Sequence, residues 1–534
     1  MRSEMKAVLA LSFLGLSLLV ATSAAQGAGT QQGGSSCEAL VSLKVPETTI
    51  TSAEVVSAGE FTPPTRPGDR PGGPPGGERM APGQGARSLP AFCRVAGVVA
   101  PQIRFEVWLP PPTGTGGWNG KFNGVGNGGL AGTISYGAMV QSLARGYATA
   151  STDAGHPEQP ENEDWALGHP ELLVDFASRS IHVTARAAKV VLLAYYGRSA
   201  ERSYFTGCSG GGGQALSEAQ RYPADYDGIV AGAPANFPTH MWPGELYPAW
   251  VTHRTPAHLI PREKLTLVHD SVLAACDATD GIEDGILADP RRCQFKPSTL
   301  LCQGPDGADC LTAAQVESFE RIYGGLEDPS SGELFWPGYE MSSEPAWAGH
   351  IFEPFSIPLS YFTYMALQER DWDWRSLDFS DPQSFAMLHG ASHRLGPILN
   401  STDPDLTAFK RLGGKLIMYH GWIDANITPR NSIAYYQAVQ EAMGGEPETQ
   451  SFVRLFMAPG MGHCGGGPGP NTFDALAALE QWVENGKAPD RITASHVSNG
   501  QVDRTRPLCA FPRVAVYQGQ GSTDDAASFE CRLP

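Results

Sequence analysis

The sequence predicts an α/β fold that is interrupted by a large inserted domain. Strand-like and helix-like segments alternate over residues 103–234 and resume after residue 414. Residues 236–405 lie between these two parts, hold six tryptophans and show no clear alternation of strand and helix. A sharp strand-to-helix turn is predicted at residues 203–217, within the first part. With 534 residues, 41% of them hydrophobic, the chain is long enough for a large core and a second domain.

The turn at residues 203–217 reads SYFTGCSGGGGQALS. Tyr204–Thr206 has the composition of a buried strand, and we expect a helix from Gln214 onward. Residues 207–211 match G-x-S-x-G, the nucleophile elbow, in which glycines permit a strained turn that exposes the hydroxyl of Ser209. A glycine-rich surface turn is the alternative interpretation, because the motif is short. A serine hydroxyl also needs a base before it can act as a nucleophile.

The remaining elements of the first part follow the order of an α/β sheet. Residues 103–109 alternate like a strand and end at a run of prolines, and residues 182–196 have helical spacing before the elbow strand. Further strands are predicted at 147–152 and 226–234. The domain boundaries are therefore placed at 26–235 and 406–534 for the two parts of the core, and at 236–405 for an inserted lid domain.

A candidate acid and base follow two strands in the last part of the chain. The strand predicted over 414–421 is followed by Asp424, and the strand over 452–456 leads to His463. Serine, then an acid after a strand, then a late histidine is the chain order of the catalytic triad in the α/β-hydrolase fold. We therefore expect Ser209, Asp424 and His463 to form a triad in an α/β-hydrolase core.

Other histidines compete for the role of base. His420 is the closest rival, but it precedes the acid, so the chain order favours His463. His156, His169 and His182 lie in the first part of the chain, where no acid accompanies them in a recognisable order. We interpret these three as structural.

A glycine-rich stretch at residues 118–129 is a candidate for the oxyanion hole. Its glycines would bring backbone N–H groups close to a substrate, although they would also suit a simple loop. The prediction is that Gly210 supplies one N–H group, and that Gly126 or Asn127 supplies the other.

The N-terminus has the features of a secretory signal peptide. Basic residues precede the apolar run Ala7–Ala21, and small residues end it before Gln26, which favours cleavage after residue 25 over a membrane anchor. The sequence thus predicts a secreted or periplasmic protein. Residues 62–90 are so rich in proline and glycine that a flexible loop or linker is expected.

Charge indicates the kind of partner. The net charge is -18, and loss of residues 1–25, which hold two basic residues and one acidic residue, changes it to -19. Nucleic acid and anionic membranes repel so acidic a chain, so the sequence predicts a small-molecule partner.

Ten cysteines form an even set that an exported protein would oxidise to disulfides. Three pairs lie close in sequence and suggest local links, whereas Cys208 with Cys464 would close a long loop. We also predict this long-range pair, because each cysteine is adjacent to a triad residue, and Ser209 and His463 must approach to about 3 Å. The ten are Cys37 and Cys93, Cys208 and Cys464, Cys276 and Cys293, Cys302 and Cys310, and Cys509 and Cys531.

An acidic segment lies within the insertion at residues 276–286, which read CDATDGIEDGI. Asp277, Asp280 and Asp284 would repel one another unless a cation neutralised them. The spacing is not that of an EF-hand, so a solvated acidic turn is the alternative interpretation.

Four segments together resemble the tannase and feruloyl esterase family: GCSGGGG at 207–213, CDATDGIEDGI at 276–286, YHGWIDANITP at 419–429 and PGMGHCGGGPG at 459–469. The resemblance implies an α/β-hydrolase core with an inserted lid, a structural calcium ion in the lid, and hydrolysis of esters of aromatic acids such as ferulate or gallate. It also implies the calcium ligands, which are the carboxylates of Asp277, Asp280 and Asp284 and the backbone oxygens of Ile282 and Ile286.

Two other functions are weighed against this expectation. The sequence also resembles hydrolases of mono(2-hydroxyethyl) terephthalate, including their five-disulfide pattern. That activity uses a lid arginine to bind a free carboxylate, and here Ala366 aligns with it while Arg370 is offset. The alternative from another functional class is a secreted binding protein that has lost catalysis. The presence of all three triad residues, in order, argues against it.

Overall fold

The computed structural model describes residues 34–63, 88–130, 132–156 and 164–534. The predicted signal peptide and most of the proline- and glycine-rich segment lie outside these residues. Among the residues described, no helix has the length and apolar character that a membrane crossing requires.

A nine-stranded sheet forms the core of the described chain, with the order β1-β2-β3-β5-β4-β6-β7-β10-β11. β1, β2, β3 and β5 pair antiparallel in turn, and the strands from β5 to β11 are parallel. The strands are β1 (Thr48–Val56), β2 (Phe92–Val99), β3 (Ile103–Leu109), β4 (Lys121–Val125), β5 (Ala148–Thr152), β6 (Arg202–Cys208), β7 (Gly228–Gly232), β10 (Lys415–Gly421) and β11 (Val453–Ala458). This mixed sheet confirms the predicted α/β-hydrolase core.

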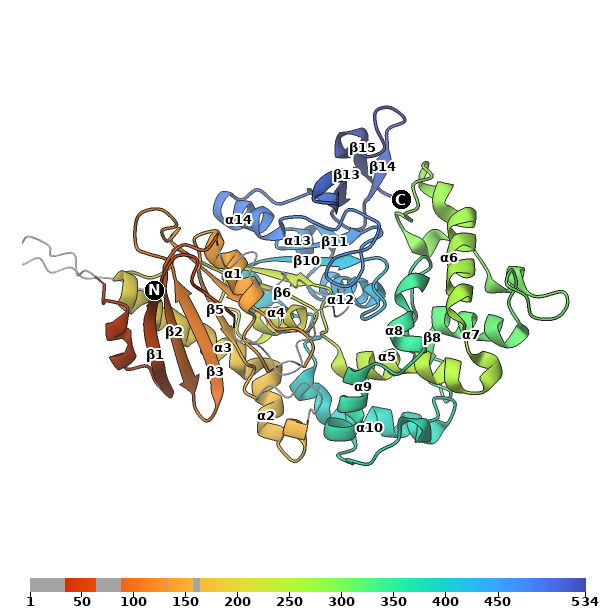
Figure 1. Cartoon of the computed structure of the whole chain (residues 1–534), viewed down its shortest axis with the longest axis horizontal. Helices are drawn as coiled ribbons and strands as arrows, with labels where there is room; N and C mark the ends of the chain where they lie inside the picture. Colours follow the sequence, from red (N-terminus) through yellow and green to blue (C-terminus); the bar gives the residue numbers. More distant parts are fainter. Residues whose placement is uncertain (1–33, 64–87, 131, 157–163) are drawn as a thin grey trace, which may run out of the picture. The chain divides into compact units, whose positions relative to one another are not determined.

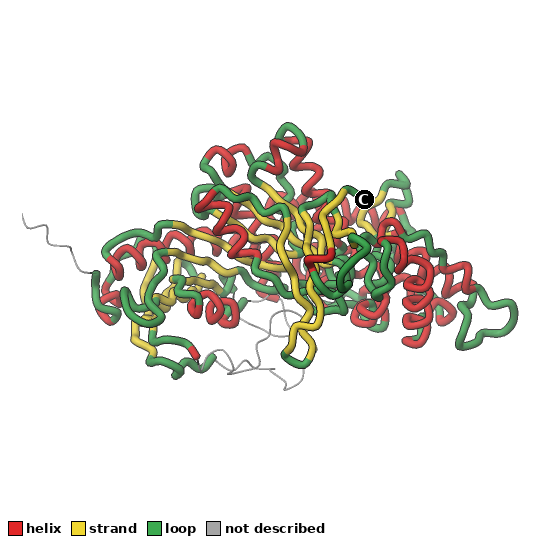
Figure 2. The backbone as a smooth tube through the Cα atoms, turned by 90° about the horizontal axis from the view of Figure 1, so that it is seen from above, coloured by secondary structure: helices red, strands yellow, loops and turns green. Residues whose placement is uncertain are grey.

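Helices cover both faces of the sheet, because successive side chains along a strand pack against helices on opposite faces. Phe205 of β6 packs in one hydrophobic cluster with α3 (Ser180–Tyr196), α4 (Gly210–Arg221) and α12 (Pro429–Ala442). Its neighbour Tyr204 points to the opposite face and packs with α14 (Ala475–Asn485). The central parallel strands are therefore buried on both faces, which accounts for their nearly continuous apolar sequence. Figure 2 shows these strands in yellow among the red helices.

On the same face as Tyr204, α1 (Tyr136–Ala144) covers the antiparallel end of the sheet. Short helices α2 (Pro170–Val174) and α13 (Glu446–Gln450) complete the two parts of the core. The C-terminal region adds two hairpins that the sequence analysis does not predict, namely β12 (Arg491–Ser498) with β13 (Gln501–Cys509), and β14 (Val514–Tyr517) with β15 (Phe529–Arg532).

The segment between β7 and β10, here called the insertion, contributes no strand to the large sheet in the described chain. It is mainly helical and appears in green to cyan in Figure 1. Its elements are α5 (Pro238–His253), α6 (Arg262–Cys276), α7 (Ala313–Gly324), β8 (Gly325–Glu327), β9 (Leu334–Pro337), α8 (Ala348–Ile351), α9 (Ser356–Ser360), α10 (Pro382–Leu399) and α11 (Thr407–Arg411). Its aromatic residues build a hydrophobic core, in which Trp347 is completely buried.

Two local predictions are wrong. The glycine-rich stretch at 118–129 is not one loop, because residues 121–125 form β4, which lies between β5 and β6 in the middle of the sheet. The helix after the elbow begins at Gly210 instead of Gln214. In both cases tertiary contacts decide the structure of a sequence whose intrinsic preference for strand or helix is weak.

All ten cysteines form disulfides in the structure. The three local links and the long-range pair are confirmed, and a fifth bond joins the start of the described chain to β2. The bonds are Cys37–Cys93, Cys208–Cys464, Cys276–Cys293, Cys302–Cys310 and Cys509–Cys531.

Candidate active site

Ser209 occupies a strained turn between β6 and α4, as the G-x-S-x-G motif predicts. Its φ of 63° and ψ of -123° lie in a region that residues with side chains rarely adopt. The backbone N–H of Ser209 donates to the carbonyl of Gly232 at 3.0 Å, and this hydrogen bond stabilises the turn. Ser209 also lines a pocket, so the strain serves to expose its hydroxyl there.

The glycines on either side of Ser209 are required by close packing of backbone on backbone. A Cβ on Gly207 would lie 2.3 Å from the carbonyl oxygen of Gly211, and one on Gly212 would lie 2.2 Å from that of Gly232. These separations are too short for any side chain. The glycine run is therefore a poor helix former by propensity, but it lets the first turn of α4 pack directly against β7.

The candidate acid and base follow adjacent parallel strands. Asp424 comes after β10 and His463 comes after β11, so both lie at the carboxyl edge of the sheet beside the elbow. The Nδ1 atom of His463 lies 2.8 Å from Oδ2 of Asp424. The structure thus brings the predicted acid and base together, and His463 lines the same pocket as Ser209.

The Asp424 carboxylate is completely buried and surrounded by donors. Its Oδ1 accepts the backbone N–H groups of Asn426 at 2.8 Å and Ile427 at 3.0 Å. Its Oδ2 faces His463 and also His420, whose Nε2 lies 3.1 Å away. Burial opposes ionisation, but the two histidines outweigh it and hold the pKa of Asp424 well below its usual value. Asp424 is therefore a buried anion that fixes the imidazole ring of His463.

The rival base, His420, has a different position. It is fully buried, its Nδ1 lies 2.7 Å from Oγ of Ser432, and its Nε2 faces both Asp424 and the carbonyl of Ile427 at 2.9 Å. Both ring nitrogens are thus engaged inside the protein. His420 contacts the Asp424 carboxylate and does not line the pocket, which agrees with the choice of His463 as base.

The disulfide between Cys208 and Cys464 joins the two loops that carry Ser209 and His463. Its Cα atoms are 5.9 Å apart, and it spans 256 residues of sequence. In the chain-entropy account, closing so long a loop disfavours the unfolded chain by about 5 kcal/mol. In the folded chain it fixes the neighbours of Ser209 and His463 relative to each other.

The two loop residues predicted for the oxyanion hole, Gly126 and Asn127, do not have free N–H groups. The N–H of Gly126 donates to the carbonyl of Thr206 at 3.0 Å, and that of Asn127 donates to Oε1 of Gln214 at 3.0 Å. The prediction is wrong for these two donors because sheet pairing and a side chain of α4 use them. Gln214 also donates to the Asn127 side chain, so this amide pair fastens the loop to the elbow helix.

The pocket beside Ser209 is walled mainly by apolar side chains. No lysine or arginine lines it in the part of the chain that the structure describes. The core contributes Leu130, Phe176 and His463, and the insertion contributes Met241, Trp242, Glu245, Phe355, Ile357 and Leu399. Such a wall suits a planar, uncharged group.

Other candidates from the sequence lie away from this pocket. His156 stacks on Trp165 at 4.0 Å between ring centroids, His169 contacts Glu171, and His182 contacts Asp225. Their interpretation as structural residues agrees with this packing. In the insertion, Ala366 is buried, and the exposed Arg370 pairs with Asp164 at 3.1 Å.

The acidic segment of the insertion forms a tight loop. Asp277 accepts the N–H groups of Gly285 and Ile286, and Asp280 accepts that of Ile282. Burial, with further contributions from the neighbouring aspartates, raises the pKa of Asp280 to about 6. The loop therefore gathers acidic oxygen atoms, which are the donor type that calcium prefers.

Part of the negative charge of this loop is already balanced. Arg506 lies 2.7 Å from Oδ2 of Asp284, and Arg504 lies 3.7 Å from the same atom. Both arginines come from β13, so the C-terminal hairpin contacts the acidic loop.

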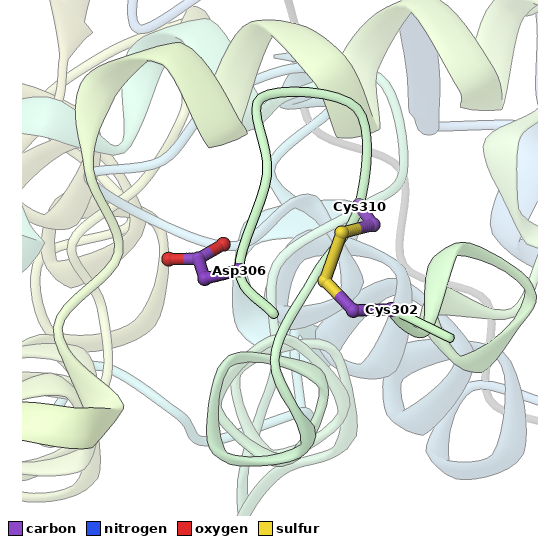
Figure 3. Close-up of side chains that lie close together, drawn as sticks. All are labelled: Cys302, Asp306 and Cys310. Atoms are coloured by element: carbon purple, nitrogen blue, oxygen red, sulfur yellow. A yellow bond between two sulfur atoms is a disulfide. The ribbon is translucent and has the colours of Figure 1, made fainter. Parts of the chain in front are cut away.

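One more trio, Cys302, Asp306 and Cys310, lies close together in the insertion (Figure 3). The two sulfur atoms are bonded to each other, and the Asp306 carboxylate contacts Nζ of Lys264 at 3.0 Å. A disulfide with a salt bridge beside it has no thiolate to offer a metal ion. This trio is a structural link.

Comparison with known proteins places this site in a family. Residues 87–532 match the family of tannase and feruloyl esterase. The chain belongs to the tannase and feruloyl esterase family. It is also 36% identical to an uncharacterised esterase of Xanthomonas campestris, over 97% of this chain and 95% of that protein. A probable feruloyl esterase B-2 of Aspergillus terreus is 34% identical over 82% of this chain and 86% of its own length.

Solved structures agree with this membership. The crystal structure of feruloyl esterase B from Aspergillus oryzae superposes with a TM-score of 0.82 and 29% identity, covering 93% of this chain and 99% of that one. The tannin acyl hydrolase from Aspergillus niger superposes with a TM-score of 0.74 at 24% identity, which supports the fold alone. This member of the tannase and feruloyl esterase family is a carboxylic ester hydrolase.

Sequence reasoning about this esterase missed two residues of the site. Gln214 was recognised only as the beginning of a helix, whereas it holds the loop opposite Ser209. Glu245 was not singled out, although it lines the pocket from α5. The sequence signal that could have identified Glu245 is helical spacing. Glu245 follows Pro238 by seven residues, so it lies on the same face of the helix as Met241 and Trp242.

Proposed function

We propose that this esterase hydrolyses esters of hydroxycinnamic or gallic acids, with Ser209, His463 and Asp424 as its catalytic triad. The observation that carries the proposal is that Ser209 and His463 line one pocket with aromatic and aliphatic walls and no lysine or arginine among the described residues. An aromatic acyl group is planar and apolar, and it would fill such a pocket. The names of the family relatives support the same class of substrate.

In the first half of the reaction, Ser209 Oγ attacks the ester carbonyl carbon as His463 takes its proton. Asp424 stabilises the imidazolium that forms and keeps its Nδ1 hydrogen directed inward. His463 then gives the proton to the leaving alcohol, and an acyl-serine remains. In the second half, His463 takes a proton from water, the hydroxide attacks the acyl group, and the proton returns to Ser209 as the aromatic acid leaves.

The oxyanion of each tetrahedral intermediate needs two donors. We propose Gly210 for one, because an N–H in the first turn of a helix has no acceptor within that helix. For the other we propose Gly129 in place of Gly126 and Asn127. Gly129 lines the pocket, and its nitrogen lies 3.4 Å from the point where a Cβ on Gly210 would lie.

Hydrolysis rates over a small panel of esters test this proposal. We expect kcat/KM for methyl ferulate, methyl caffeate or methyl gallate to exceed that for mono(2-hydroxyethyl) terephthalate by about 10-fold or more. The physical reason is that a free carboxylate would lose its hydration in a pocket with no cationic side chain among the described residues. A preference for the terephthalate ester would contradict the proposal.

We also propose that the insertion acts as the lid of the pocket and holds a structural calcium ion. The carboxylates of Asp277, Asp280 and Asp284 and the carbonyls of Ile282 and Ile286 would be its ligands, as the family resemblance implies. The residues fit the ion in donor type, because all of these atoms are oxygens. Bound calcium would neutralise the acidic loop and link α6 to the segment that follows it.

Chelation tests the calcium site. Removal of the metal from the purified esterase should lower its melting temperature by about 5 °C, since an ion bound only by the folded state stabilises that state. Asp280→Asn should abolish this difference, whereas Asp306→Asn, which alters the Lys264 salt bridge, should preserve it. Equal melting temperatures with and without metal, in protein shown by elemental analysis to have lost it, would contradict the site.

For localisation, we propose that the protein is secreted or periplasmic. Five disulfides support an oxidising compartment. The predicted cleavage after residue 25 is tested by sequencing the N-terminus of the mature protein.

A further inference from the structure

Glu245 is an ionisable residue in the wall of the pocket that the mechanism does not use. It belongs to α5, and its side chain lines the pocket together with Met241 and Trp242. The residue is only 3% exposed, and its Oε2 atom is buried with no hydrogen-bond partner among the described residues. A buried polar atom without a partner is uncommon in proteins and calls for an explanation.

The spacing along α5 makes the position of Glu245 unusual. Pro238, Met241, Trp242 and Glu245 all line the pocket, and they are related as i, i+3, i+4 and i+7. These positions form one stripe on a helix, and in a packed helix the stripe is normally apolar. The carboxyl group at the end of this stripe is buried, and its Oε2 atom gains no hydrogen-bond partner from the residues that the structure describes.

The surroundings of Glu245 favour the neutral form of its carboxyl group. Burial, and to a smaller extent the negative charge of Asp424, raise its pKa well above the usual value. Tyr339 is another titratable neighbour, and it is buried and uncharged. A neutral carboxyl group has both a hydrogen-bond donor and an acceptor, whereas a carboxylate has acceptors only.

We propose that Glu245 is a substrate-binding residue that recognises a hydroxyl group on the aromatic ring of the acyl group. The proposal rests on the proposed function and narrows it to phenolic acids. A phenolic hydroxyl both donates and accepts, so it matches a neutral carboxyl group and would give this side chain a hydrogen-bond partner from the pocket. A ring without a hydroxyl would leave the carboxyl group unsatisfied, and a site built to bind a hydroxyl discriminates strongly against such an analogue.

The test compares methyl 4-hydroxycinnamate with methyl cinnamate, which differ only in the ring hydroxyl. The measured quantity is the ratio of their kcat/KM values, so that a general loss of activity cancels. In the wild-type enzyme we expect the ratio to favour the hydroxylated ester by about 10-fold or more. Glu245→Met, which keeps the approximate length and removes the hydrogen bonds, should bring the ratio close to 1.

Two further variants make the result specific. Glu245→Gln retains one donor and one acceptor, so its ratio should stay within about 3-fold of the wild-type ratio. Met241→Leu changes the pocket wall one helical turn away without changing any hydrogen bond. Its ratio of kcat/KM values for the two esters should therefore equal the wild-type ratio. If Glu245→Met does not fold, Glu245→Gln and Glu245→Leu provide the same comparison, with loss of the ratio expected only for leucine.

The outcomes separate this inference from the proposed function. A wild-type ratio near 1, or a ratio that survives in Glu245→Met, overturns the role of Glu245 while ester hydrolysis itself remains. An equal loss of the preference for the hydroxylated ester in Glu245→Met and Glu245→Gln also overturns the role of Glu245. The amide retains a donor and an acceptor, so a hydrogen bond to the ring hydroxyl should have survived in Glu245→Gln. If the wild-type enzyme hydrolyses neither cinnamate ester, the proposed function fails together with the inference.

Discussion

Ser209→Ala should abolish ester hydrolysis, with kcat lowered by at least about 10⁴-fold. In the proposed mechanism the acyl group is bonded to Oγ of Ser209 in the covalent intermediate. Removing the nucleophile of a triad removes nearly all of its catalysis. The substitution deletes one oxygen and leaves the backbone at the same positive φ. We therefore expect an unchanged melting temperature, and activity on a chromogenic aryl ester is the measurement.

Ser217→Ala provides the matched control for this variant. Ser217 is on the same helix, α4, it is buried, and its hydroxyl has no hydrogen-bond partner among the described residues. Losing that hydroxyl should alter neither stability nor turnover. Activity of Ser209→Ala close to that of the Ser217→Ala control would rule out Ser209 as the nucleophile.

The grouping of Ser209, Asp424 and His463 could be predicted because its signals are local in the sequence. The glycines around Ser209 specify the elbow, and Asp424 and His463 each follow a strand made of consecutive apolar residues. Parallel strands place their carboxyl ends along one edge of a sheet, so the chain order was enough to bring acid and base together. Adjacent cysteines then predicted a covalent link between the same loops, which the structure confirms.

The oxyanion loop could not be predicted because its hydrogen bonds are tertiary. The N–H of Asn127 is used by Gln214, which lies 87 residues further along the chain. The N–H of Gly126 is used by β6, which pairs with β4. Without knowing that β4 lies beside the elbow strand, sequence reasoning cannot tell which glycine of the stretch retains a free donor.

The role of Glu245 was hidden by two prolines. Pro243 and Pro248 lie inside α5, and a proline within a helix removes a hydrogen bond and usually ends the helix. The sequence shows no clear alternation of strand and helix after residue 236, so it predicts neither this helix nor its pocket-facing stripe. In the structure α5 continues through both prolines, in a segment that is buried along most of its length. Packing in the insertion thus overrides the local preference.

Asp424→Asn should lower kcat by about 10³- to 10⁴-fold and change KM much less, because Asp424 acts on His463 and does not line the pocket. The carboxylate accepts from four groups. Oδ1 accepts two backbone N–H groups, while Oδ2 faces both His463 and His420. An amide has only one oxygen, so one of these pairs must face an NH₂ group.

Either orientation of the asparagine harms the enzyme. With its oxygen toward the backbone, the NH₂ group faces His463 and favours the tautomer in which Nδ1 accepts and Nε2 carries the hydrogen. That tautomer cannot take the proton of Ser209. With its oxygen toward His463, the NH₂ group opposes the buried N–H groups of Asn426 and Ile427, and an unsatisfied buried donor costs about 1–3 kcal/mol of stability. The variant should therefore lose turnover, with a lower melting temperature if the second orientation prevails.

Asp381→Asn is the control for exchanging a carboxylate for an amide. Asp381 caps the start of α10 by accepting the N–H of Gln383 at 3.0 Å, and asparagine caps a helix about equally well. This variant should match the wild-type enzyme in kcat and in melting temperature. Single-turnover kinetics with an aryl ester would show whether Asp424→Asn slows acylation itself. A kcat within about 10-fold of wild type would show that His463 does not depend on Asp424 for its tautomer.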